Sequence, residues 1–154
     1  MYKTILLAYD GSIEGRRALR EGAKLAQLCS AEVFLLAVVE LSPIVSPEAG
    51  LPIPIDDQTV NYKAILAEGV ARLKALGFSA TSRLETGDAG QKIAEFAAEI
   101  GADLVVVGHR PQGPLARWWF GSIGSYLVKR LSCSVLVAQT EISDDEFEQL
   151  QPQN

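Results

Sequence analysis

The sequence is poor in the residues that build metal and disulfide sites, since its 154 residues include only two cysteines and one histidine. Cys29 and Cys133 stand far apart, without a CxxC or Cys/His grouping, which argues against a zinc site and suits two reduced thiols. No apolar run approaches the roughly 18 residues that a membrane span needs. The first residues, MYKTILLAYDG, turn acidic too early for a signal peptide. These absences predict a cytoplasmic protein without a metal site or a membrane segment.

The sequence also lacks an excess of positive charge, and its net charge of −5 has an uneven origin. Five of the 19 acidic residues lie after Thr140, where there is no Lys or Arg. Residues 1–139 therefore contain 14 acidic and 14 basic residues. A formally neutral body gives no electrostatic reason to expect nucleic-acid binding. We therefore predict one folded domain over residues 1–139 and an acidic tail over residues 140–154.

Short apolar segments alternate with segments of helical periodicity along the domain. The expected strands cover residues 3–9, 31–39, 78–87, 103–108 and 133–139. The expected helices cover residues 13–29, 57–76, 89–100 and 121–131. Continuously apolar strands such as AEVFLLAVV are typical of parallel sheets that helices cover on both faces. The fold class that follows is α/β, a doubly wound five-stranded parallel sheet with helices on both faces.

Turn and capping residues mark the ends of these elements. Ser12 is expected to cap the first helix, and Asp88 with Gln91 resembles a capping box for the third. Gly77 and Gly101 are expected to close the second and third helices. Four prolines in residues 40–56 exclude a regular helix or a central strand there and predict a long surface loop.

Two loops carry the residues of greatest chemical interest. Asp10-Gly11-Ser12 follows the first strand, and Gly108 to Gly121 follows the fourth. Doubly wound sheets bind ligands where the strand order reverses, so the two loops converge on one crevice if these strands are neighbours there. Gly121-Ser122 opens a helix, which offers free backbone N–H groups to an anion. Equally, Ser122 can simply cap its own helix while Gly121 makes the turn.

The spacing of the second loop resembles a nucleotide signature. Gly108, two residues, position 111, nine residues and then Gly121-Ser122 resemble the G-2x-G-9x-G-[S/T] pattern of the universal stress protein (UspA-like) family. The segments ILLAYDGS, EVFLLAVVE and CSVLVA also look like that family, so the resemblance covers nearly all of residues 3–139. It implies a strand order of 3-2-1-4-5 and an adenine nucleotide between strands one and four. It further implies a homodimer paired through the fifth strand, residues 133–139.

Carried over position by position, the resemblance assigns a role to each part of the site. Ala8, Tyr9 and Asp10 would line the adenosine, and Val38 would contact the adenine ring. Gly108 would lie against the ribose and phosphates. The phosphates themselves would be held at the start of the helix by Gly121, Ser122, Ile123 and Gly124.

The sequence departs from the family pattern at Pro111, which replaces the second glycine of the signature. Proline has no N–H, so a backbone donor to a phosphate is lost there. If that donor served a phosphate, the loss is about tenfold to a hundredfold in affinity. Gly113 could give a shifted loop its flexibility, and His109 and Arg110 could replace the lost donor by charge. Solvated loop residues are the simpler interpretation of both side chains.

Two functions remain after these observations. The first is a cytoplasmic stress-response or signalling protein that binds ATP, ADP or AMP, with or without Mg²⁺, as a homodimer. The alternative keeps the fold and the dimer but binds no nucleotide and acts as an adaptor through contacts with another protein. The sequence has no GxxxxGK[ST] loop, and Asp10 is the one acid expected at the crevice, so we predict no enzyme beyond slow incidental ATP hydrolysis.

Overall fold

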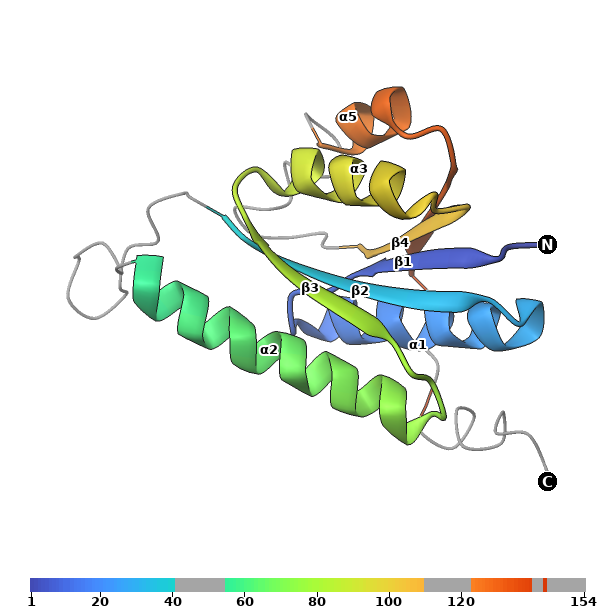
Figure 1. Cartoon of the computed structure of the whole chain (residues 1–154), viewed down its shortest axis with the longest axis horizontal. Helices are drawn as coiled ribbons and strands as arrows, with labels where there is room; N and C mark the ends of the chain where they lie inside the picture. The colour runs from blue at the N-terminus through green and yellow to red at the C-terminus, as the bar shows by residue number, and fades with distance from the viewer. Residues whose placement is uncertain (41–54, 110–122, 140–142, 144–154) are drawn as a thin grey trace.

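The computed structural model describes residues 1–40, 55–109, 123–139 and 143 (Figure 1). Arg110, Gly113, Gly121 and Ser122 of the predicted site lie outside these residues, as does the tail except for Ser143. The strands of the described part are β1 (Thr4–Ala8), β2 (Glu32–Val39), β3 (Thr81–Thr86), β4 (Leu104–Gly108) and β5 (Ser134–Ala138). Its helices are α1 (Ile13–Cys29), α2 (Ile55–Ala75), α3 (Ala89–Ile100) and α5 (Ile123–Arg130).

The five strands form one parallel sheet in the order β3-β2-β1-β4-β5. This confirms the predicted fold class and the strand order that the resemblance implied. β1 lies at the centre, with Leu6 in register with Phe34 of β2 on one side and Val105 of β4 on the other. The chain leaves β1 toward β2 and later returns past it to β4, so the strand order reverses between β1 and β4.

Helices cover both faces of the sheet, with α1 and α2 on one side and α3 and α5 on the other (Figure 1). Successive residues of β1 point to opposite faces, so Ile5 and Leu7 pack toward α1 and α2 while Leu6 packs toward α3 and α5. All three are at most 1% exposed. Burial on both sides explains why the strand is continuously apolar instead of alternating.

The helix ends follow the predicted capping residues. Ser12 Oγ accepts from Gly15 N at 3.0 Å, and Asp88 Oδ1 accepts from Gln91 N at 2.8 Å. Gly77 and Gly101 have φ of +84° and +63°, which suits glycine at a helix end. The predicted capping box is wrong for Gln91. Among the described residues, its side chain donates to Glu95 at 2.7 Å instead of bonding back to the start of α3.

Most boundaries lie within one residue of the sequence prediction, but the starts of α2 and β3 differ by two residues or more. α2 begins at Ile55, two residues before the expected start, because Pro54 is excluded from a helix interior but does not prevent a helix from starting directly after it. β3 begins at Thr81 and not at residue 78. The Phe78 N–H donates to the Leu73 carbonyl at 3.0 Å and so belongs to the end of α2, and the ladder with β2 starts only at Thr81.

Candidate functional site

A cavity of about 150 Å³ opens at the carboxyl ends of β1, β2 and β4, where the strand order reverses. The starts of α1 and α3 and one side chain of α2 complete its wall. Doubly wound sheets bind their ligands at this position, because the loops on either side of the reversal diverge and leave a gap. The residues that line it are Ala8, Tyr9, Asp10, Ser12, Glu14, Gly15, Leu36, Val38, Glu40, Tyr62, Ala89, Ile93, Val107 and Gly108.

The turn after β1 presents a fixed carboxylate to this cavity. Asp10 Oδ1 accepts from Ser12 N at 3.0 Å and from Ser12 Oγ at 2.5 Å. Gly11, between them, has φ of +75°, a conformation that glycine adopts without strain. The Ser12 hydroxyl in turn accepts from Gly15 N, so the turn and the first turn of α1 form one hydrogen-bonded unit. A carboxylate held in this way can accept hydrogen bonds from ligand hydroxyl groups.

Two glycines allow α1 to approach the end of β4. A Cβ atom on Gly108 would lie 2.6 Å from the Glu14 carbonyl oxygen and 3.0 Å from Gly15 N. A Cβ atom on Gly15 would lie 2.5 Å from Asp10 Oδ1. All three distances are below normal van der Waals contact, so each position excludes larger residues for packing reasons alone. Gly108 thus has a structural role besides the ligand role that the resemblance implies.

The opposite wall of the cavity is mainly apolar. Leu36 and Val38 of β2 face it together with Ala89 and Ile93 of α3. Tyr62 reaches it from α2. An apolar wall beside a carboxylate-bearing turn suits a ligand with one flat apolar part and one part rich in hydroxyl groups.

Glu40 ends the apolar wall on the β2 side. It is half-buried, and burial raises the pKa of its carboxyl, with the nearby Asp88 carboxylate as a second cause. Taking a carboxylate out of water disfavours its charged form, and a second negative charge disfavours it further.

Tyr9 lies largely on the other side of the sheet. It is 3% exposed and belongs to the core cluster under α1 and α2, where a Cβ atom on Gly69 would lie 2.8 Å from Tyr9 Cδ1. Burial raises the pKa of its hydroxyl against the opposing effect of Arg16. The ring therefore packs against α2, although the residue also borders the cavity.

The structure brings together five of the twelve residues predicted for the nucleotide site. Ala8, Tyr9, Asp10, Val38 and Gly108 all line the cavity. His109 follows β4 directly and is half-buried, but it is not among the lining residues. Ile123 and Gly124 are the first two residues of α5. The remaining four, Arg110, Gly113, Gly121 and Ser122, lie outside the described residues.

Sequence reasoning missed several lining residues. Glu40 could have been found, because it directly follows β2 and continues the two-residue alternation of Leu36 and Val38. Gly15 could have been inferred, because a glycine in the first turn of a helix lets a neighbouring segment pack closely against that helix. Tyr62 carries no such signal, because its place depends on how α2 crosses the sheet.

The described residues include neither a cluster of metal-binding side chains nor a helix that could span a membrane. No group of three or more His, Cys, Asp or Glu side chains there is arranged to hold a metal ion. No helix among them is long and apolar enough to cross a bilayer.

Comparison with known proteins agrees with the fold. The sequence pattern of the Universal stress protein family matches residues 1–139. Universal stress protein MJ0531 of Methanocaldococcus jannaschii is 30% identical over 146 residues, covering 90% of this chain and 83% of its own length. The crystal structure of a universal stress protein in complex with cAMP superposes with a TM-score of 0.68 at 25% identity, covering 91% of this chain and 99% of that one.

A universal stress protein family structure from Burkholderia pseudomallei gives a similar result. Its TM-score is 0.67 at 27% identity, and the superposition covers 88% of this chain and 95% of that one. Sequence and structure therefore agree over nearly the whole described domain. The chain belongs to the universal stress protein family.

Proposed function

We propose that this protein binds ATP or a related adenine nucleotide in the cavity at the carboxyl ends of β1, β2 and β4, and that it acts as a cytoplasmic homodimer in stress response or signalling. The observation that carries the proposal is the meeting of Ala8, Asp10, Val38 and Gly108 in one cavity at the reversal of strand order. A related protein of the same fold was crystallised with cAMP, which is itself an adenine nucleotide.

The lining of the cavity suits the parts of such a ligand. The Asp10 carboxylate would accept hydrogen bonds from the ribose hydroxyls, and the apolar wall at Val38 would cover the adenine ring. The phosphates would then extend past Gly108 toward the start of α5, where Ile123 and Gly124 contribute backbone N–H groups. From the sequence we also assign Gly121 and Ser122 to the phosphates. Gly113, His109 and Arg110 would compensate for the donor that Pro111 lacks.

A magnesium ion would enter with the phosphates and not through a site of its own. Mg²⁺ usually keeps several waters and binds through one or two carboxylates and the phosphates of the substrate. Asp10 offers one such carboxylate. Because the sequence has no GxxxxGK[ST] phosphate loop, we propose no dedicated phosphoryl-transfer chemistry and at most slow incidental ATP hydrolysis.

The alternative is a protein of the same fold and dimer that binds no nucleotide and acts through a partner protein. Pro111 favours it, since the backbone donor at that position of the signature is missing. The packing roles of Gly108 and Gly15 also account for these glycines without a ligand.

Calorimetric titration of the purified protein with ATP and AMP separates the two functions. We expect saturable heat for the parent chain and a roughly tenfold to hundredfold weaker Kd for Asp10→Asn, which removes the charge but keeps an oxygen for the Ser12 bonds. Glu32→Gln is the matched control, because Glu32 is exposed at the opposite end of β2. No heat at about millimolar nucleotide, with none released from the denatured protein, overturns nucleotide binding in favour of the adaptor.

A further inference from the structure

The side of α1 that faces away from the sheet carries a row of basic residues. The helix turns its small and apolar residues inward, and the buried ones are Gly15, Ala18, Leu19, Gly22, Ala23 and Ala26. Spacings of three or four residues place Arg17, Arg20 and Lys24 together on the opposite side. Ile13 and Leu28 continue this line at its two ends, and they are 64% and 74% exposed. These five residues are called the α1 row below.

The other charged residues of α1 leave the row predominantly basic. Arg16 turns toward α2, where its guanidinium donates to Glu68 at 2.8 Å. Glu14 lines the cavity. Glu21 lies on the flank of the row, so this side of the helix carries three basic residues and one acidic residue. Lys24 forms no ion pair with any other residue that the structure describes. Such a surface attracts a negatively charged occupant.

The chain itself contains a negatively charged segment directly after its last strand. The acidic tail, residues 140–154, has five acidic residues and no Lys or Arg. It follows the part of the chain that matches the family pattern, residues 1–139. Four of its acids fall within five consecutive positions, namely Asp144, Asp145, Glu146 and Glu148. Phe147 and Leu150 add two large apolar side chains. The tail therefore complements both the charges and the exposed apolar ends of the α1 row.

The tail begins beside the first turn of α1. Ala138, the last residue of β5, is in register with Gly108 of β4. Gly108 packs against α1 so closely that an added Cβ atom would lie 2.6 Å from the Glu14 carbonyl oxygen. Neighbouring strands are about 4.8 Å apart, so the chain leaves the sheet about one strand spacing from the start of α1. Ile13 forms the near end of the α1 row.

The lengths of the tail and of the α1 row also agree. From Ile13 to Leu28 the row is about 22 Å long, because each helical residue rises about 1.5 Å. An extended chain covers about 3.3 Å per residue, so the tail can reach past the far end of the row. The acidic positions 144–148 extend over about 13 Å, which is close to the roughly 10 Å between Arg17 and Lys24.

We propose that the acidic tail docks on the α1 row of its own chain, with the carboxylates of residues 144–148 pairing with Arg17, Arg20 and Lys24 and with Leu150 covering Leu28. Exposed ion pairs contribute little one at a time. A tethered segment, however, meets its surface at an effective concentration of about millimolar, so several weak pairs together can hold it. The docked tail neutralises the row and keeps other acidic chains from it. This inference goes beyond nucleotide binding and does not depend on it.

NMR of the isotope-labelled, full-length chain tests this contact. At about 20 mM salt we expect the backbone amides of residues 144–150 to have the high heteronuclear NOE of an ordered segment. Arg20→Gln/Lys24→Gln removes two of the three charges and keeps good helix formers, so we expect it to reduce that NOE by more than half and to shift the Leu28 amide. About 1 M salt should do the same to the parent chain, because it screens exposed charges beyond about 3 Å.

Two further variants show whether the effect belongs to these charges. Lys63→Gln/Lys74→Gln is the matched control, because it removes two exposed charges from α2 and should leave the tail docked. The second variant changes the tail instead of the helix and combines Asp144→Asn, Asp145→Asn and Glu148→Gln. We expect it to release the tail and to shift the Leu28 amide as the α1 variant does.

Three results would overturn the docking. The first is a parent tail that has the low NOE of an unfolded segment at low salt. The second is an ordered tail that Arg20→Gln/Lys24→Gln leaves unchanged, since the tail would then contact another surface. The third comes from mixing labelled and unlabelled chains: an isotope-filtered NOE between Leu28 methyl groups and the tail would assign the contact to a second copy of the chain.

Discussion

At the scale of single residues, Gly108 shows how packing and ligand binding can both require a glycine at one position. The resemblance explains Gly108 as part of a phosphate-binding loop, and the structure gives it a second cause, since α1 leaves no room for a Cβ atom there. The atoms in the way are the carbonyl carbon and oxygen of Glu14 and the amide nitrogen of Gly15, which are backbone and cannot rotate aside. The two explanations predict different results for a small substitution.

We therefore expect Gly108→Ala to lower the free energy of unfolding by about 1–3 kcal/mol even without nucleotide, because overpacking shifts the backbone of α1. Urea unfolding monitored by circular dichroism measures this. Gly77→Asn is the control: its added Cβ meets no atom within 4 Å, and asparagine tolerates the left-handed conformation, so it should change stability by about half a kcal/mol or less. Equal stability of Gly108→Ala and the parent would show that the glycine serves the ligand alone.

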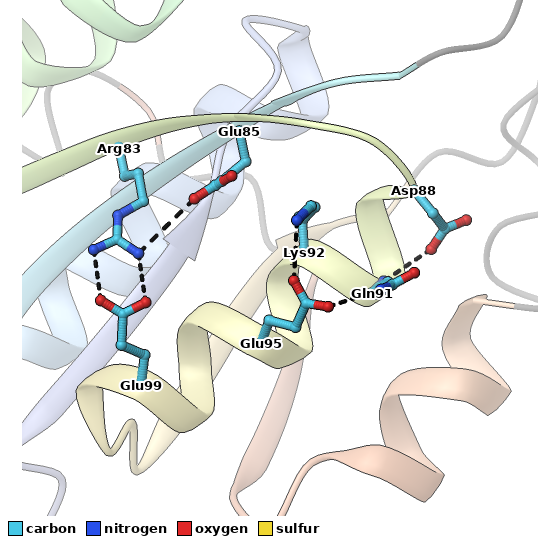
Figure 2. A network of polar contacts seen from close by, with 7 residues as sticks. All are labelled: Arg83, Glu85, Asp88, Gln91, Lys92, Glu95 and Glu99. Carbon is cyan, nitrogen blue, oxygen red and sulfur yellow. Dashed lines mark hydrogen bonds and ion pairs between the residues drawn. The ribbon is translucent and has the colours of Figure 1, made fainter.

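At the scale of elements, a polar network ties the outer strand β3 to α3 (Figure 2). Arg83 of β3 donates to both oxygens of Glu99 at 2.6 Å, and its guanidinium lies 4.1 Å from the centre of the Phe96 ring. One turn earlier on α3, Glu95 accepts from Gln91 and Lys92 within the helix itself. The Arg83–Glu99 contact joins β3 to α3, whereas the contacts of Glu95 join residues of α3 alone.

This difference predicts that replacing Arg83 changes the pKa of Glu99 but not that of Glu95. The hydrogen bonds from Arg83 hold the pKa of Glu99 below its ordinary value, so the stabilisation is present above about pH 4.5 and is lost as pH falls through the lowered pKa. In Arg83→Met we expect the pKa of Glu99 to return to its usual range while that of Glu95, lowered by Gln91 and Lys92, stays low. Carboxyl carbon chemical shifts followed against pH measure both, and an unmoved Glu99 would contradict the pairing.

The sequence predicted where the elements lie, but not every contact or boundary between them. Periodicity located all five strands and the described helices, because each element buries a face whose repeat is visible in the chain. The carboxyl-end position of Asp10 followed from topology. The contribution of Tyr62 did not, because it requires the path of α2 across the sheet. The late start of β3 could not be predicted either, since it depends on one hydrogen bond between Phe78 and the end of α2.

At the scale of the whole molecule, the sheet ends at β5, which pairs with β4 along its full length. Its outer edge pairs with no other strand in the described part of the chain. Unpaired strand edges tend to associate with another chain, and a two-fold axis would bring two copies of β5 together in antiparallel orientation. A dimer formed in this way would continue one sheet through both subunits, and this is the arrangement that we propose.

The direction of the backbone groups offers a specific test of that dimer. The Ser134 N–H donates to the Asp103 carbonyl at 3.1 Å, toward β4, so the Val135 N–H points to the outer edge, since successive N–H groups of a strand alternate. Val135→Pro therefore removes a donor on the outer edge and none on the inner one, as edge strands tolerate. Val135→Ala removes more of the packing of this side chain but keeps the N–H, so it controls for lost packing.

We expect the parent and Val135→Ala to sediment at twice the 16.6 kDa chain mass, and Val135→Pro to sediment as a folded monomer at the same concentration. Circular dichroism checks that the proline variant keeps its sheet and helices, because the ladder between β5 and β4 retains its own donors. A parent chain that sediments as a monomer would reject the dimer altogether. A dimeric Val135→Pro would instead place the contact between subunits on a surface other than the edge of β5.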